Sequence, residues 1–410
     1  MMFLEYFIWG AWYVTLGTWL GQTLHFSGEQ IGLAAGTTAL GAVLSPFLVG
    51  LMADELFANQ RLLAALHGIG GVLLWYASTR TSFGLMYLVL LIYSLCYMPT
   101  MALTNALAFR QMKDPKQDFG SIRVLGTAGW IIAGLFIGLL GKMGYAGVEA
   151  TAIPIRVASI CSIVFAFYAL TLPHTPPLRS AHGFKLSNIF PPEAFRLFKD
   201  RNFSVFALAS FLICIPLQFY YTFTNPFLNE IGVENAVGKM TGGQMSELLF
   251  MVTLPWFFKR LGVKYTLMLG MLAWVVRYIC FGTGNAGSLV WVLYLGIVLH
   301  GICYDFFFVT GQVYVDQKAP QVLRAAAQGM ITFITYGIGM FVGSWICGRV
   351  VDAYVTTSAA GAAVHNWRSI WMVPAAASAV VLVFFALGFR NREAEPRADR
   401  ALAEAGGAQI

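Results

Sequence analysis

Apolar runs of about twenty residues follow one another along this chain and limit the folds open to it. They lie near 3–24, 31–53, 62–79, 83–109, 123–142, 150–172, 203–229, 239–258, 263–282, 287–314, 325–350 and 366–389. A helix rises about 1.5 Å per residue, so each run can cross the roughly 30 Å hydrocarbon core of a bilayer. Only 11% of the residues are charged, whereas a soluble domain has about 25%. We therefore expect an all-α membrane protein with twelve transmembrane helices.

The distribution of basic residues predicts the orientation of these spans. Most of the 26 Lys and Arg residues fall in alternate loops and in the C-terminal tail. By the positive-inside rule, both termini are then cytoplasmic. The formal charge of +7 fits basic loops beside anionic lipid and requires no nucleic-acid partner. The first run lacks the basic start of a signal peptide, so we interpret it as a span.

A polar stretch divides the spans into two sets of six. We expect an N-terminal half at 1–172, a cytoplasmic linker at 173–202, a C-terminal half at 203–389 and a disordered cytoplasmic tail at 390–410. The turns after the second and eighth spans are faintly related, with Gly50-x-x-x-Asp54 in one and Lys259-Arg260-Leu-Gly262 in the other. Two related six-helix halves are the design of major facilitator transporters.

Polar groups inside hydrocarbon are costly and mark functional sites. Arg123 opens the fifth span, and Thr127 and Trp130 follow on the same helical face. Arginine offers fixed donors to a carbonyl or carboxylate, and tryptophan offers a stacking surface. The alternative is an arginine that extends to the membrane surface from the end of a span.

A second polar stripe lies in the seventh span, which is otherwise built largely from Phe, Leu and Ile. Its members follow helical spacing and are Gln218, Tyr221, Thr222 and Asn225, flanked by Pro216 and Pro226. The prolines predict a bent helix. Amides supply donor and acceptor together, as a base edge or a sugar hydroxyl requires. Interhelical hydrogen bonding is the alternative use of such a stripe.

Acidic residues inside the eighth and tenth spans are candidates to carry protons. Gln244 and Glu247 are one turn apart, and His300, Tyr304 and Asp305 lie close together. Apolar surroundings favour the protonated form of a carboxyl group. His300 could bind substrate, relay protons or be an ordinary core residue. Glu247 could instead pair with Arg277. Glu5, near the start of the first span, is expected at the membrane surface.

No enzyme signature is found along the chain. There is no Walker loop, HExxH or G-x-S-x-G sequence, so we expect a protein that is not an enzyme and needs no cofactor or metal. The six cysteines all lie in apolar runs and are expected to be core residues. No obligatory protein partner is indicated.

Short segments, spread in order along the chain, resemble the bacterial nucleoside:proton symporters of the major facilitator superfamily. They are Trp9-Gly-Ala-Trp12 with Thr15-Leu-Gly17, Tyr97-Met98-Pro99-Thr100 with Asn105, Ile122-Arg123-Val-Leu-Gly126-Thr127, Leu217-Gln218 with Asn225, Gln244-Met-Ser246-Glu247, Gly301 with Asp305-Phe306-Phe307, and Arg324-Ala-Ala-Ala-Gln328-Gly329-Met330. They cover nearly the whole chain.

The resemblance implies nucleoside uptake across the inner membrane, driven by protons. It implies binding positions at Arg123, Thr127, Gln218, Asn225, Gln244, Glu247 and Asp305. The chain departs from the family in carrying Trp130, Tyr221, His300 and Tyr304 where Phe, Asn, Tyr and Phe are found. We expect these four side chains to face the substrate too, with Glu247 or Asp305 coupling protons.

Other functions remain open at this point. A major facilitator transporter for a sugar, or a drug/proton antiporter, would show the same spans. The amides at Gln218 and Asn225 favour a hydrogen-bonding solute over an apolar drug. A membrane sensor or enzyme would need a soluble domain or a catalytic cluster, which the sequence does not offer.

Overall fold

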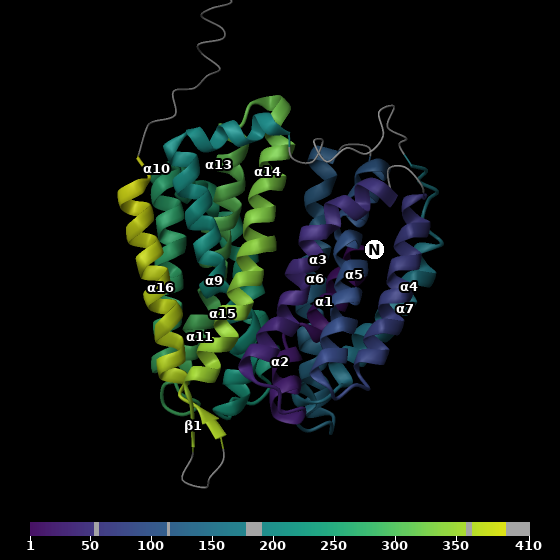
Figure 1. Cartoon of the computed structure of the whole chain (residues 1–410), viewed down its shortest axis with the longest axis vertical. Helices are drawn as coiled ribbons and strands as arrows, with labels where there is room; N and C mark the ends of the chain where they lie inside the picture. The colour runs from purple at the N-terminus through teal and green to yellow at the C-terminus, as the bar shows by residue number, and fades with distance from the viewer. Residues whose placement is uncertain (53–56, 113–114, 178–190, 358–362, 391–410) are drawn as a thin grey trace, which may run out of the picture.

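The computed structural model describes residues 1–52, 57–112, 115–177, 191–357 and 363–390, and the side chains of 46–52, 115–121 and 363 lie outside the description. It is built almost entirely from helices (Figure 1). Among the described residues, seven helices are long and apolar enough to span a bilayer by length and composition alone. Residues 178–190 of the predicted linker, the tail from 391 and Asp54 lie outside the described residues.

The first part of the chain forms one group of helices. Its elements are α1 (Met2–Trp12), α2 (Leu16–Thr18), the π turn η1 (Trp19–Thr23), α3 (Gly28–Met52), α4 (Asn59–Ala77), α5 (Phe83–Gln111), α6 (Pro115–Lys142), the 3-10 turn η2 (Val148–Ala150) and α7 (Ile153–Ala169). Within this group α1 packs on α6 and α7, while α4 packs on α5 and α7.

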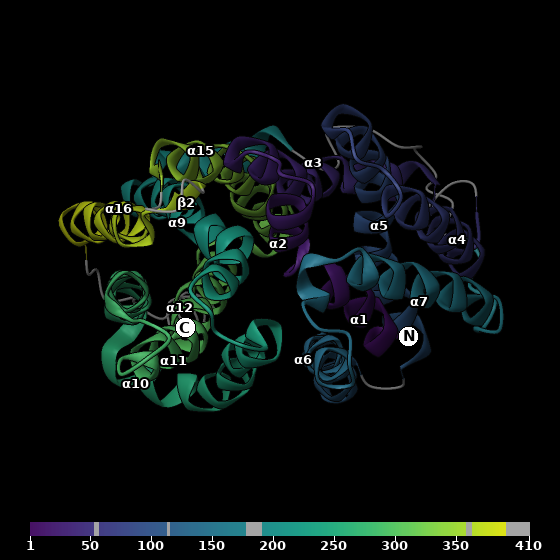
Figure 2. The ribbon, with the colours of Figure 1, turned by 90° about the horizontal axis from the view of Figure 1, so that it is seen from below.

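The rest of the chain forms a second group beside the first (Figure 2). It contains η3 (Pro192–Lys199), α9 (Arg201–Glu230), α10 (Ala236–Thr283), α11 (Val290–Val298), α12 (His300–Tyr304), η4 (Asp305–Val309), α13 (Thr310–Lys318), η5 (Gln321–Leu323), α14 (Arg324–Thr332), η6 (Phe333–Gly339), α15 (Met340–Ala353) and α16 (Trp367–Gly388). A small hairpin joins α15 to α16, in which β1 (Val355–Thr357) pairs antiparallel with β2 (Ala363–His365).

Proline and glycine mark special positions in two of these helices. The expected prolines, Pro216 and Pro226, both lie inside α9. The predicted eighth and ninth spans join into α10, and the backbone breaks between them at Gly262, where φ is 67° and ψ is 178°. Glycine has no Cβ, so it adopts this positive φ without strain. The turn at Lys259-Arg260-Leu-Gly262 is thus a kink between two helical segments of α10.

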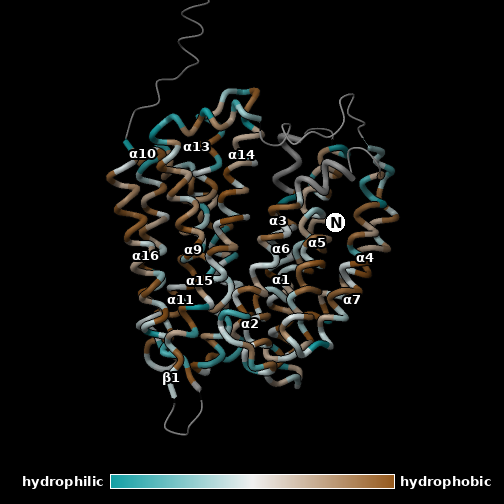
Figure 3. Tube along the Cα trace, viewed as in Figure 1, coloured by the Kyte–Doolittle hydropathy of each residue, from teal (hydrophilic) through white to brown (hydrophobic). Residues whose placement is uncertain are grey.

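Hydropathy follows the arrangement expected in a bilayer. Figure 3 shows apolar residues along the helices and hydrophilic ones concentrated toward the two ends of the molecule. Many large apolar side chains on the outer faces are exposed, including Leu139, Phe167, Val252 and Val380. Exposed apolar surface on this scale requires a cover, and lipid supplies it.

The two groups meet most closely where α3 crosses α15. Gly28, Gly32 and Gly36 lie one turn apart on α3, and a Cβ on any of them would collide with Ser344 or Gly348 of α15. Small residues at four-residue spacing let membrane helices approach until their backbones touch. The contact lies toward the end of the molecule that carries the hairpin (Figure 1).

Candidate functional site

A cavity of about 460 Å³ lies between the two groups of helices. Eight of the predicted site residues line it: Arg123, Thr127, Trp130, Tyr221, Gln244, Glu247, His300 and Tyr304. The volume lies in the range of small-molecule sites. Side chains far apart in the sequence therefore converge on one polar and aromatic chamber.

The wall from the first group combines a cation with aromatic rings. The guanidinium carbon of Arg123 lies 4.4 Å from the centre of the Tyr6 ring. Trp130, two turns along α6, meets Trp9 edge to face at a centroid distance of 5.4 Å. Arg123 thus lines the cavity and rests on an aromatic face, an arrangement in which the cation and the ring quadrupole attract each other.

The opposite wall carries the acid and the imidazole from α10 and α12. His300 Nε2 lies 3.9 Å from Glu247 Oε2, and the two side chains are 2% and 17% exposed. Tyr304 Oη lies 2.7 Å from Tyr336 Oη, within hydrogen-bond distance. The alternative pairing of Glu247 with Arg277 is not the contact seen, because Arg277 Nη1 lies 3.2 Å from His300 Nδ1 instead.

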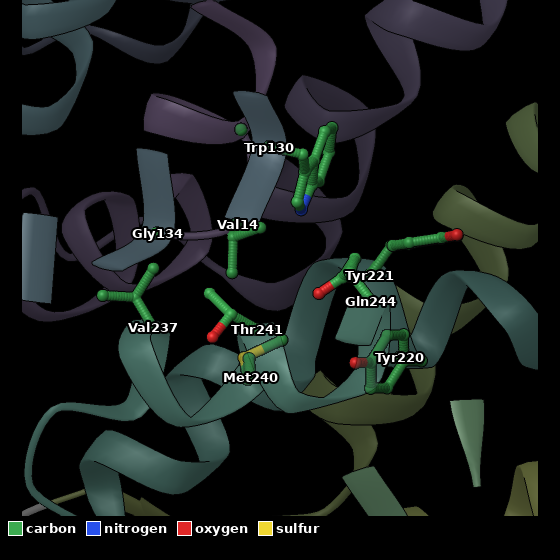
Figure 4. A pocket seen from close by; sticks show the side chains of 10 residues that line it. Val14, Trp130, Gly134, Tyr220, Tyr221, Val237, Met240, Thr241 and Gln244 are labelled. Carbon is green, nitrogen blue, oxygen red and sulfur yellow. The ribbon is translucent and has the colours of Figure 1, made fainter. Parts of the chain in front are cut away.

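Trp130, Tyr221 and Gln244 separate this cavity from a second, much smaller pocket (Figure 4). The small pocket continues along Val14, Val237 and other residues toward the hairpin end. These three side chains therefore form the wall between the chamber and the closed end of the molecule.

The polar stripe of α9 divides among three surroundings. Tyr221 lines the cavity, whereas Gln218 and Asn225 are fully buried and do not. The Gln218 amide lies beside the Tyr13 hydroxyl, although it makes no hydrogen bond of ordinary geometry. The Asn225 amide is held by the Thr18 hydroxyl at 2.5 Å and by Glu149 Oε2 at 2.7 Å.

Asp305 lies behind the cavity wall, in the π turn η4. Its side chain is 0% exposed, and neither carboxyl oxygen has a hydrogen-bond partner among the described residues. Single π turns inside helices occur often at functional sites. A carboxylate is costly to bury without partners, so the neutral acid fits this surrounding best.

Several lining residues were not singled out as site residues from the sequence. Tyr6, Trp9 and Tyr13 all reach the cavity from the start of the chain, and Asn105 and Tyr336 reach it from α5 and η6. The first three share one helical face by spacing. An aromatic stripe beside the polar residues of other spans was therefore the available signal. Tyr336 had none, because it lies in an apolar run.

Polar contacts close the hairpin end between the two groups. Glu149 Oε2 accepts hydrogen bonds from Asn225 Nδ2, Asn229 Nδ2 (3.0 Å) and the Val237 amide (3.1 Å). The Asp352 carboxylate accepts from the amides of Gly28 and Glu29 at 2.6 and 2.8 Å. A carboxylate at the N-terminus of α3 accepts hydrogen bonds from its free amides and interacts favourably with the positive end of the helix dipole.

A polar chamber between two groups of apolar helices, closed at one end, is the architecture of a membrane transport protein. The chain matches the family described as nucleoside H+ symporter over residues 1–394, and it belongs to that family. It is 42% identical to YegT of Escherichia coli (strain K12), over 96% of this chain and 93% of that protein. It is 32% identical to the xanthosine permease of the same strain, over 98% and 97%.

A solved structure supports the same assignment. The crystal structure of the nucleoside transporter NupG has a TM-score of 0.86 to this chain at 31% identity, covering 95% of this chain and 98% of that one. The fold is accordingly that of the major facilitator transporters.

Proposed function

We propose that this protein takes up nucleosides together with protons by alternating access, with the central cavity as the binding site. The observation that carries the proposal is the joining of stacking surfaces, amide and guanidinium donors and a partly buried carboxyl in one chamber. A nucleoside needs these groups, since its base has two flat faces and a polar edge and its sugar carries hydroxyls.

The geometry supports a definite binding mode. The base stacks on Trp130 or Tyr304, which line opposite walls. Arg123 and amide groups bind the polar edge of the base, while Gln244 and Glu247 hold the sugar hydroxyls. Base-aromatic stacking is worth about 1–3 kcal/mol. Gln218, beside Tyr13, supports the cavity from behind, whereas Asn225 belongs to the contacts that close the hairpin end.

Protons couple to transport through Glu247 or Asp305. Protonation of either acid removes a charge that opposes one of the reorientation steps. One charge moving through the membrane field gains about 2.3 kcal/mol per 100 mV, enough to drive accumulation. Glu247 lines the cavity and Asp305 lies buried behind it, so a proton passing between them would move from the site into the C-terminal half.

The spans are arranged as two sets of six, at 1–172 and 203–389, with a cytoplasmic linker between them. At about 1.5 Å per residue the 48 residues of α10 would extend about 72 Å, more than twice the hydrocarbon core. Its corner at Gly262 thus supports two crossings. With both termini cytoplasmic in the inner membrane, the closed hairpin end faces the periplasm.

Uptake into proteoliposomes tests this function. Purified protein should accumulate labelled uridine, adenosine or xanthosine when the outside is acidic, and an uncoupler should abolish accumulation. Excess nucleoside should compete, whereas maltose should not. Glu247→Gln and Asp305→Asn are compared for accumulation and for counterflow, which needs no proton gradient. Counterflow without accumulation identifies the coupling acid, while no flux of any nucleoside would reject the function.

A further inference from the structure

Arg277 is a charged side chain buried behind the cavity wall. It lies on the second half of α10 and is 0% exposed. Its guanidinium carbon lies 3.2 Å from the centre of the Tyr220 ring. The side chain reaches the binding site through His300, whose Nδ1 lies 3.2 Å from Arg277 Nη1. A buried guanidinium is costly, so this contact requires an explanation.

The contact between Arg277 and His300 determines which ring nitrogen of His300 carries the hydrogen. Every N–H of arginine donates and none accepts, and the group does not lose its proton in proteins. His300 Nδ1 must therefore accept from Arg277. In a neutral imidazole one nitrogen accepts and the other donates, which leaves the hydrogen on Nε2. That nitrogen is the one on the side of Glu247, at 3.9 Å from its Oε2.

A second proton on His300 is excluded while Arg277 stays in place. It would have to occupy Nδ1, where it would point at an Arg277 N–H. Two positive groups would then lie about one hydrogen-bond length apart with both side chains at most 2% exposed, and Coulomb repulsion is strong in such surroundings. Among the described residues, the other titratable or charged groups around His300 are Glu247, Tyr220, Tyr221, Tyr304, the Cys303 thiol beside Arg277 and, through Glu247, Arg123.

We propose that Arg277 is a positioning residue that holds His300 as a neutral Nε2–H donor, aimed at a hydroxyl or carbonyl oxygen of the nucleoside. His300 then serves substrate binding and is removed from the proton pathway. The inference rests on the proposed function for its ligand, whereas the protonation state of His300 stands on the contact with Arg277 alone.

Nitrogen-15 NMR of the purified protein, labelled at histidine, reads this state directly. The chain has six histidines, and the signals lost in His300→Tyr assign the ring. We expect a bare Nδ1 and a protonated Nε2, unchanged between about pH 5 and pH 8. A hydrogen on Nδ1, or titration of His300 within that range, would overturn the proposal. The reading requires no transport, so it holds even if nucleosides prove to be the wrong substrate.

Variants of Arg277 test the consequence for binding. Arg277→Met removes the cation beside Nδ1, so His300 can take up a second proton, at a pH that NMR titration of this variant measures. The imidazolium is then drawn to Glu247 and away from the ligand. Below that pH the ratio of variant to wild-type uridine affinity should fall roughly tenfold per pH unit, as the neutral fraction does. Arg277→Lys, which still only donates, should keep the wild-type pH profile.

The double variant Arg277→Met/His300→Tyr controls for general damage. Its affinity relative to His300→Tyr should not depend on pH, because the titrating ring is gone. If Arg277→Met gives the same pH profile as wild type while its NMR spectrum shows a folded protein, Arg277 does not control His300. If the wild-type protein binds no nucleoside, the proposed function fails and the NMR result still decides the state of His300.

Discussion

The imidazole Nε2 of His67 lies 3.1 Å from the carboxylate Oε2 of Glu5, and the two side chains are 1% and 0% exposed. Glu5 Oε1 also lies 2.6 Å from the Thr100 hydroxyl. The expectation of a surface position for Glu5 is wrong. Its partners come from α4 and α5, so the apolar run around it gave no sign of a buried pair.

Removing one partner of this pair should destabilise the protein strongly. Glu5→Leu leaves His67 without its partner, and breaking a buried pair costs about 3–5 kcal/mol. Glu5→Gln keeps a donor and an acceptor and should cost about 1 kcal/mol. Thermal unfolding in detergent, followed by tryptophan fluorescence, measures the difference. If both variants melted at the wild-type temperature, the pair would contribute nothing to stability.

Trp130 should contribute a large share of nucleoside affinity. Loss of a stacking ring costs about 1–3 kcal/mol per base, so Trp130→Ala should weaken binding by roughly tenfold or more, and Trp130→Phe by less. Titration calorimetry measures both. Trp256, on α10 and 54% exposed, supplies the matched control, because Trp256→Ala should leave affinity unchanged. If Trp130→Ala binds nucleoside with unaltered affinity, we would infer that the base stacks on Tyr304 instead.

Asn225 should act more on the closed end than on the substrate. Its amide is engaged by Thr18 and Glu149, and a buried hydrogen bond to a charged group is worth about 1.5–3 kcal/mol. Val233 lies between α9 and α10 and is 4% exposed, so a cysteine placed there reports opening of this end. Asn225→Ala should raise the rate at which a membrane-impermeant maleimide labels that cysteine about tenfold. Glu149→Ala should raise it further. A large loss of nucleoside affinity without faster labelling would return Asn225 to the binding site.

Asp200 should stabilise the protein only above acidic pH. Burial acts to raise the pKa of this carboxyl, but hydrogen bonds from Lys318 Nζ (2.8 Å) and the Phe203 amide (3.0 Å) outweigh it and lower the pKa below its usual value. Because the folded pKa is the lower one, the contribution is complete above about pH 4 and is lost as the pH falls through the folded value.

Two substitutions separate the roles of Asp200. It caps the N-terminus of α9. Asp200→Ala loses the cap and the ion pair and should cost about 1 kcal/mol. Asp200→Asn keeps the cap and should cost only a few tenths, because the pair with Lys318 is over one-third exposed. Unfolding measured at pH 7 and near pH 3 checks this, since the cost of Asp200→Asn should be smaller at the lower pH.

The fold was largely predictable because lipid imposes a simple rule on sequence. A span must be apolar over its whole length, so hydropathy placed a helix at each expected run. Breaks inside helices were harder to predict. Asp305 opens a π turn and Trp19 opens another, and neither has a proline to mark it. Such turns depend on packing between helices, which local sequence does not encode.

The site was predicted where polar residues stood out against hydrocarbon, as Arg123 and Glu247 do. It was incomplete where the cavity is lined by residues typical of any membrane helix, such as Tyr336 and Met98. The stripe on α9 shows a further limit. Gln218, Tyr221 and Asn225 share a helical face, yet they have different partners because α9 passes several neighbouring elements along its length. Periodicity identifies a face but not its surroundings.

The glycine crossing between α3 and α15 has a mechanical consequence. Gly32 and Gly36 meet Ser344, and Gly28 meets Gly348, through backbone and small groups. The glycines themselves present no side chains that interlock, so at these positions α3 and α15 can tilt against each other without repacking. Leucine side chains at these positions would interdigitate, so any tilt of one helix against the other would require them to repack. Resistance to movement at this crossing therefore comes from the polar contacts beside the glycines, such as Asp352 with the Gly28 and Glu29 amides, and not from the glycines.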